Sequence, residues 1–191
     1  MCIDIKIMAL GYMLIFSGAR RGEILGMEWH NVDWEKGTVK IEKNVLYVPD
    51  KGIYVDTPKT DTSLRTISLP KKMMTVLYDY KEWLEWEQER IGWSWNKGND
   101  FIFTSETGDM MHPDTVSKWL RQVEKKNPNI PHLNAHAFRH SVASALIFHG
   151  IDPVSVSRRL GHAQVSTTTN IYAHVLRCAD DRNAEVLGEI F

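Results

Sequence analysis

The chain has 191 residues, of which 43% are hydrophobic and 25% charged, as in one folded globular domain and unlike a disordered or fibrous chain. No apolar run approaches the roughly 20 residues that a membrane-spanning helix needs, and the two cysteines fit neither a disulfide framework nor a zinc site, so we expect a cytosolic protein with no membrane contact. The formal net charge of −1 lacks the basic excess that nucleic-acid binding usually leaves in a sequence.

Two helices and a small sheet are expected in the first third of the chain. Residues 3–16 are almost wholly apolar, and this run is long enough for a buried helix that ends at Gly18. A second short helix is predicted over residues 21–29. Alternating apolar and polar residues then predict strands separated by turns at 49–52 and 59–63. The apolar positions of these strands are Val39, Ile41, Val45, Tyr47, Ile53, Val55, Ile67 and Leu69.

The rest of the chain is predicted to be helical. Apolar residues at helical spacing indicate a first helix around 73–84. The expected boundaries of the next helices are Pro113 for one start, Asn134 and Gly150 for the following helix, Asp152-Pro153 and Gly161 for the one after, and Ser166 for a last start. The predicted fold class is therefore α+β: a mainly helical single domain over residues 1–191 with one small antiparallel β-sheet.

An arginine and a glutamate follow the first helix in the segment 17–23, Ser-Gly-Ala-Arg-Arg-Gly-Glu. Arg20 lies where two apolar helices meet around glycines, so its guanidinium can project from a tight turn. Glu23 can support Arg20 from the start of the second helix. Taken alone, the pattern also fits an exposed arginine at a helix start.

A second group of polar residues opens the helix that Asn134 caps. With about 3.6 residues per turn, His136, Arg139 and His140 share one face of this helix, which gathers two imidazoles and a guanidinium. Three polar residues on a solvated helix face are the alternative interpretation. The apolar residues of this helix occupy a different stripe, which consists of Phe138, Val142 and Ala145 together with His149.

A third group ends in a tyrosine. Leu160-Gly161-His162 predicts a tight turn, Ser166-Thr167-Thr168 a helix start, and Tyr172 follows ten residues after His162. A lone tyrosine would be an ordinary core residue. In this order, however, the three groups resemble the catalytic-residue boxes of tyrosine recombinases of the phage and conjugative-transposon integrase type. The resemblance covers roughly residues 8–176, and it includes Trp29 and Asp33-Trp34 after the first group and Tyr172-Ala173-His174 at the end.

The resemblance implies a catalytic set of Arg20, Lys59, His136, Arg139, His162 and Tyr172, with Glu23 in support. Tyr172 would be the nucleophile that forms a covalent 3′-phosphotyrosine bond, which conserves the phosphodiester energy without an energy cofactor. Arg20 and Arg139 would clamp the negative charge of the transition state. His136 would help Tyr172 to attack and His162 would hold the phosphate or the nucleophile. Lys59, between two predicted strands, would protonate the leaving 5′-oxygen.

Charge and metal-ligand patterns bear on this interpretation. Residues 131–172 contain three arginines and five histidines against one acidic residue, Asp152, so this half is locally basic, while many acidic residues lie in a predicted solvated helix face within 81–90. We expect no cofactor and no metal. A metal hydrolase built on His136 and His140 is an alternative, but no glutamate lies between the two histidines as in His-Glu-x-x-His.

The resemblance also implies partners: double-stranded DNA at attachment sites, further copies of the chain in a tetramer on DNA, and accessory excisionase or DNA-bending proteins. We expect the upstream core-binding domain of full integrases to be absent and the DNA affinity to be weak. Residues 173–191 carry an apolar helical stripe that is either exchanged between subunits or packed on its own core. A type IB topoisomerase and a non-catalytic DNA-binding module of the same fold are the remaining alternatives.

Overall fold

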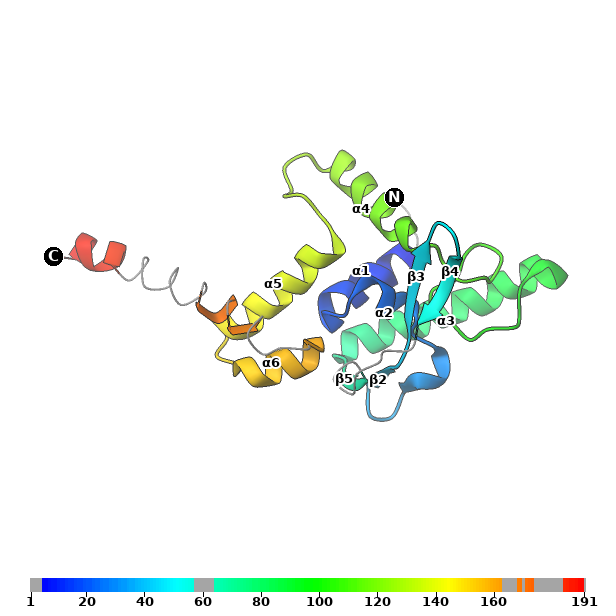
Figure 1. The fold of residues 1–191 in the computed structure, drawn as a ribbon, viewed down its shortest axis with the longest axis horizontal. Coiled ribbons are helices and arrows are strands. Elements are labelled where there is room, and N and C mark those ends of the chain that lie inside the picture. Colours follow the sequence, from blue (N-terminus) through cyan, green and yellow to red (C-terminus); the bar gives the residue numbers. More distant parts are fainter. Residues whose placement is uncertain (1–4, 57–63, 163–167, 170, 174–183, 191) are drawn as a thin grey trace.

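The computed structural model describes residues 5–56, 64–162, 168–169, 171–173 and 184–190. The named helices are α1 (Ile5–Ser17), α2 (Arg21–Leu25), α3 (Lys71–Ile91), α4 (Pro113–Lys126), α5 (Ala135–Phe148) and α6 (Pro153–Leu160), with 3-10 turns η1 (Trp29–Asn31) and η2 (Gly92–Ser94). Residues 184–190 form one more short helix, whose residues are all exposed. None of the described helices is long and apolar enough to cross a membrane. In Figure 1, α5 and α6 lie together on one side of α1.

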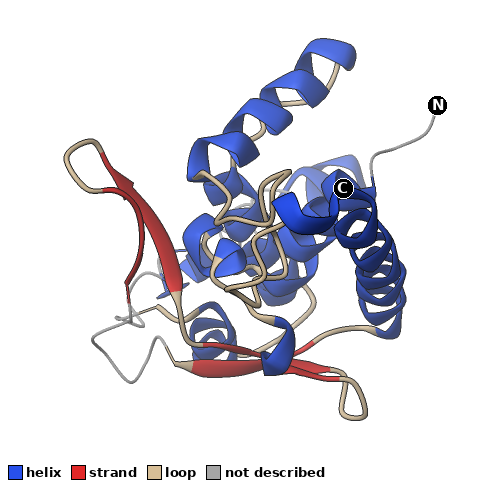
Figure 2. Ribbon diagram, turned by 90° about the vertical axis from the view of Figure 1, so that its right-hand side faces the viewer, coloured by secondary structure: helices blue, strands red, loops and turns tan. Residues whose placement is uncertain are grey.

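The strands form two antiparallel sheets. Strands β1 (Val32–Asp33), β2 (Thr38–Ile41) and β5 (Arg65–Ser68) make one sheet in the order β1-β2-β5, while β3 (Asn44–Val48) and β4 (Gly52–Asp56) pair only with each other among the described strands. Figure 2 shows the β3-β4 hairpin extending away from the three-stranded sheet. The mainly helical α+β class predicted from the sequence is confirmed, although its strands are divided between two sheets.

The alternation over residues 39–47 does not continue as one strand, because the chain leaves the first sheet after Ile41. The surroundings of two glycines show the path of the chain after Ile41. A Cβ atom on Gly26 would lie 2.7 Å from the carbonyl oxygen of Lys43, and one on Gly22 would lie 2.6 Å from that of Val45, so the backbone runs directly over α2. Tyr47, which the alternation placed on the buried side, is 46% exposed and its ring lies 4.4 Å from that of His112.

The main core lies between α1, α3 and the three-stranded sheet. Met13, Leu77 and Tyr80 are fully buried there, and the Tyr80 ring stacks on Phe103 with 5.5 Å between the ring centroids. Burial of such large apolar side chains is the dominant favourable term in folding. This core fixes the C-terminal end of α1, from which the chain turns into α2.

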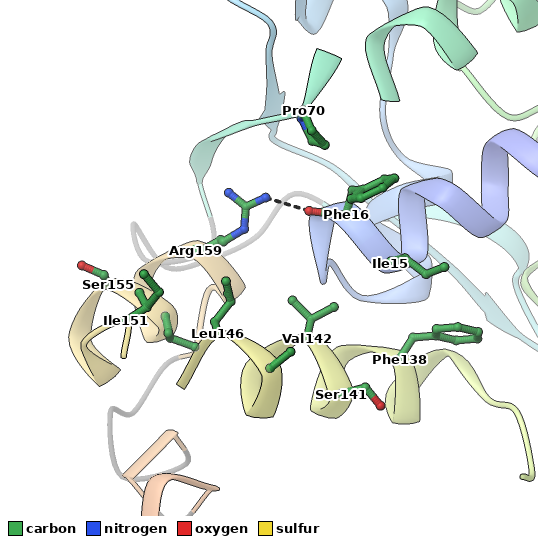
Figure 3. A pocket seen from close by; sticks show the side chains of 12 residues that line it. Ile15, Phe16, Pro70, Phe138, Ser141, Val142, Leu146, Ile151, Ser155 and Arg159 are labelled. Atoms are coloured by element: carbon green, nitrogen blue, oxygen red, sulfur yellow. Dashed lines mark hydrogen bonds between the residues drawn. The ribbon is translucent and has the colours of Figure 1, made fainter. Parts of the chain in front are cut away.

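A second, smaller cluster joins α5 to α6 through Ala143, Ile147, Val156 and Leu160. Between this pair and the end of α1 lies an apolar hollow of about 950 Å³ (Figure 3), and Arg159 donates to the carbonyl oxygen of Phe16 across it at 2.7 Å.

Several predicted helix boundaries agree with the structure, and two predictions differ. Asn134 and Asp152 accept backbone N–H groups at the starts of α5 and α6, and Gly161 ends α6 with φ of +67°. The second helix is shorter than predicted, since α2 stops at Leu25. On α5 the buried residues are Arg139, Ala143 and Ile147, rather than the apolar stripe expected from the sequence.

Candidate active site

Arg20 caps the N-terminus of α2, at the turn between α1 and α2. The turn begins at Gly18, whose φ of +61° suits glycine, and where a Cβ atom would lie 2.5 Å from a methyl of Leu160. The Arg20 side chain is 45% exposed, and its Nη2 donates to the carbonyl oxygen of Gly161 at 3.1 Å. One side of this guanidinium is therefore held by the protein and the other side faces solvent.

Glu23 is the buried acceptor behind Arg20. Its Oε1 accepts from Nη1 of Arg20 at 2.9 Å and its Oε2 accepts from the Arg20 backbone N–H at 2.7 Å. Burial by itself raises the pKa of Glu23, but the hydrogen bonds and charges of Arg65 and Arg20 outweigh burial and keep that pKa below its usual value. The carboxyl is thus ionised at neutral pH, as a support for an arginine requires.

Arg65 is a member of this cluster that the sequence argument did not single out as a site residue. Its Nη2 donates to Oε2 of Glu23 at 2.8 Å, its Nη1 donates to Oε1 at 3.2 Å, and its Nε donates to the carbonyl oxygen of Arg159 at 2.8 Å. The signal available in the sequence was its place in Arg65-Thr66-Ile67-Ser68, close after Lys59. Nothing local in that segment shows that the side chain reaches α2.

Arg139 points from α5 into the same region and is only 4% exposed. Its Nη1 donates to the carbonyl oxygen of Gly18 at 2.9 Å, and its Nε donates to Nε2 of His162 at 3.3 Å. Its Nη2 is buried and has no hydrogen-bond partner within the described part of the chain. Burial, with the nearby charge of Arg20, lowers the pKa of Arg139 to about 10, which leaves it charged at neutral pH.

His162 follows the Gly161 turn and is held at both ring nitrogens. Because Arg139 can only donate, Nε2 of His162 is the acceptor, and Nδ1 carries the proton that it shares with Oγ1 of Thr168 at 2.8 Å. The pKa of His162 is lowered to about 4, mainly by burial and then by the charges on Arg139 and Arg20. His162 is therefore a neutral imidazole of one fixed tautomer at neutral pH.

His136 and His140 lie next to each other on the exposed side of α5, with 2.8 Å between their Nε2 atoms. Burial lowers the pKa of His140, and the neighbouring His136 and Arg139 lower it further. The predicted shared face is therefore split: the two imidazoles stay at the surface while Arg139 is buried. The described residues contain no group of three or more His, Cys, Asp or Glu side chains that could hold a metal ion.

Tyr172 and Lys59 complete the set that the sequence predicted. The half-buried Tyr172 ring packs against the cluster of Ala143, Ile147, Val156 and Leu160, beside α5 and α6. Lys59 lies outside the described residues, in the connection between β4 and β5. The structure thus brings two pairs together at the turns of Gly18 and Gly161: Arg20 with Glu23, and Arg139 with His162.

The fold and this arginine-rich group define the class of protein. Residues 2–177 match the model of the phage integrase family, so the chain belongs to that family, and its fold is that of a tyrosine recombinase catalytic domain. The family resemblance read from the sequence motifs is confirmed.

Particular relatives support the same class. The chain is 28% identical to a protein named tyrosine recombinase XerC-like from Caldanaerobacter subterraneus subsp. tengcongensis, over 97% of this chain and 50% of the relative. It is 28% identical to the ICEBs1 integrase of Bacillus subtilis, over 91% of this chain and 46% of the relative. The chain thus spans about half the length of these curated relatives.

A solved structure shows the fold. The Tn1549 transposon integrase, in complex with transposon right end DNA, superposes with a TM-score of 0.73 at 24% identity, covering 94% of this chain and 59% of that one.

Proposed function

We propose that this protein carries out site-specific DNA recombination, in which Tyr172 attacks a DNA phosphate and forms a covalent 3′-phosphotyrosine intermediate. The observation that carries the proposal is the buried Nη2 of Arg139, a permanently charged donor without an acceptor among the described residues. Leaving such a donor unpaired costs about 1–3 kcal/mol, and an anionic oxygen would recover that cost.

Charge supports an anion at this place. Arg20, Arg65 and Arg139 surround the single carboxylate of Glu23, so the group carries a net positive charge. The exposed side of Arg20 and the unpaired side of Arg139 are the two guanidinium edges that protein acceptors leave available. Planar guanidinium groups match the geometry of phosphate oxygens, and they stabilise the extra negative charge that develops when a nucleophile attacks phosphorus.

The remaining roles follow the catalytic set predicted from the sequence. His136, exposed on α5 next to His140, assists Tyr172 by taking up the proton of its hydroxyl, because a tyrosine needs an adjacent base to become a good nucleophile. His162 is neutral and holds a phosphate oxygen or the nucleophile, while Lys59 supplies the proton that the leaving 5′-oxygen needs. No step requires a metal or another cofactor.

Double-stranded DNA is the proposed substrate, bound at specific attachment sites in the cytoplasm. The Tn1549 transposon integrase was solved with transposon DNA, which fits this assignment for a chain of the same fold. Further copies of the chain, accessory excisionase or DNA-bending proteins, and an upstream core-binding domain would complete the reacting complex. The exposed Val186, Leu187 and Ile190 of the last helical segment favour exchange of residues 173–191 between subunits over packing on their own core.

A nicked duplex that traps the intermediate tests the proposal. The short downstream fragment, which carries the free 5′-hydroxyl, diffuses away after cleavage, so a protein–DNA adduct accumulates and runs as a slower band on a denaturing gel. We expect the wild-type chain to give this band in excess EDTA, and Tyr172→Phe to give none. Cleavage that needs magnesium and persists in Tyr172→Phe would refute the proposal and favour a metal hydrolase.

A further inference from the structure

Arg65 holds a place in this site that the proposed catalytic set leaves out. We propose that Arg65 is a positioning residue, which acts through Glu23 to keep the Arg20 guanidinium oriented toward the DNA phosphate. This inference rests on the proposed function and adds one residue to it. The Arg65 side chain is only 7% exposed, so it acts on the substrate through its neighbours and not by touching DNA.

Arg65 and Arg20 share the carboxylate of Glu23. Glu23 uses both carboxylate oxygens for both arginines: Oε1 accepts from Nη1 of Arg20 and Nη1 of Arg65, and Oε2 accepts from the Arg20 backbone and from Nη2 of Arg65. The paired contact from Arg65 fixes the plane of the carboxylate. A fixed carboxylate in turn fixes the guanidinium of Arg20, whose other edge faces solvent.

Arg65 also changes the net charge around Glu23. Glu23 and Arg20 alone would form a neutral ion pair, in which the carboxylate cancels the charge that a phosphate should meet. With Arg65 on the buried side, the three groups together carry one net positive charge. Since Arg65 is buried and Arg20 is 45% exposed, Arg20 is the member of the three that can present this charge outward.

Arg65 also contacts the turn that leads to His162. Arg65 donates to the carbonyl oxygen of Arg159, and Gly161 lies so close that a Cβ atom there would be 2.6 Å from Nη1 of Arg65. The carbonyl oxygen of Gly161 is the second acceptor of Arg20. Arg65 therefore contacts both supports of Arg20, the carboxylate of Glu23 and the 159–161 turn.

A double-mutant cycle measures whether Arg65 acts through Glu23. The variants are Arg65→Met, Glu23→Gln and the combination, assayed for single-turnover formation of the covalent adduct on the nicked duplex. We expect Arg65→Met to slow adduct formation by about 10- to 100-fold, the factor that corresponds to one lost charge-assisted hydrogen bond. In the Glu23→Gln background the same change should slow the reaction by less than about 3-fold, because its partner is already lost.

Two further variants separate positioning from general support of the fold. Arg65→Lys keeps the charge but cannot span both oxygens of Glu23, so its rate should lie between those of wild type and Arg65→Met. If Arg65→Met does not fold, the cycle is run with Arg65→Lys instead. Arg159→Met is the matched control, because this arginine binds the carbonyl oxygens of Phe16 and Ser68, and its effect should multiply with that of Glu23→Gln.

The outcomes distinguish this inference from the proposed function. Strong coupling between Arg65 and Glu23, with none for Arg159, supports the inference. Independent effects of Arg65 and Glu23, or wild-type rates in Arg65→Met, would overturn it while leaving the proposed function intact. A wild-type chain that forms no adduct at all would overturn both.

Discussion

Arg139 donates from Nε to Nε2 of His162 across 3.3 Å, and this contact joins α5 to the turn after α6. A guanidinium can only donate a hydrogen bond, so Nε2 of His162 must be an unprotonated acceptor. Burial, and after it the charge on Arg139, lowers the pKa of His162 and keeps the histidine neutral, while the histidine supplies an acceptor to the buried cation. The first two predictions follow from this pair.

The stability of the protein should depend on pH through His162. Its folded pKa is lowered to about 4, whereas an unfolded histidine titrates near 6.5, so the unfolded chain binds the additional proton between these values. Stability is therefore lost as pH falls from about 6.5 toward 4. The free energy of unfolding is measured by urea denaturation at several pH values and plotted against pH. In this window the plot should be shallower for His162→Gln than for wild type, since the contributions of other groups are common to both proteins. Equal slopes would contradict the assigned pKa.

Replacement of Arg139 should separate activity from stability. Arg139→Met leaves the carbonyl oxygen of Gly18 and Nε2 of His162 without their donor, so we expect the free energy of unfolding to fall by about 1–3 kcal/mol. Formation of the covalent adduct should fall by about 100- to 1,000-fold, as for loss of one transition-state donor. Arg121→Met, at an exposed arginine of α4, is the control and should leave both quantities near wild type. A large loss of stability with an unchanged rate of adduct formation would show that Arg139 supports the fold and not the reaction.

The turn at Gly161 should tolerate no side chain. Its φ of +67° and the 2.6 Å approach to Arg65 both oppose a Cβ atom, so Gly161→Ala should cost about 1–3 kcal/mol of unfolding free energy and should slow adduct formation. Gly150 is a matched control, because its φ is +80° and nothing lies within 4 Å of an added Cβ atom. Gly150→Ala should therefore cost only the backbone strain. Chemical denaturation of the two variants measures the difference, and equal costs would show that the contact with Arg65 is unimportant.

Local sequence signals predicted the helices well, because capping depends on neighbouring residues. Asn134, Asp152 and Gly161 each occupy the boundary that their side chain or backbone preference indicates. The ordered motifs likewise predicted the family. Each cap and each motif lies within a few residues along the chain, and the order of the motifs from Arg20 to Tyr172 then indicates the family.

Long-range contacts could not be predicted in the same way. Helical periodicity placed Arg139 with His136 and His140, yet Arg139 is buried because acceptors from Gly18 and His162 reach it from distant segments. Arg65 joins Glu23 across 42 positions of sequence. The alternation over 39–47 gave no sign that the chain leaves the sheet to pass over α2. In each case a partner far along the chain determines where the residue or segment lies.

The central claim is that Tyr172 itself bonds to DNA, and the site of attachment can be mapped directly. The trapped adduct is digested with nuclease and trypsin, and the nucleotide-bearing peptide is sequenced by mass spectrometry. Cleavage after Arg159 and Arg177 gives the peptide 160–177, which contains Tyr172 and no other tyrosine. We predict a nucleotide phosphate on Tyr172 of this peptide. A nucleotide on any other residue, or DNA cleavage without a modified peptide, would contradict the account.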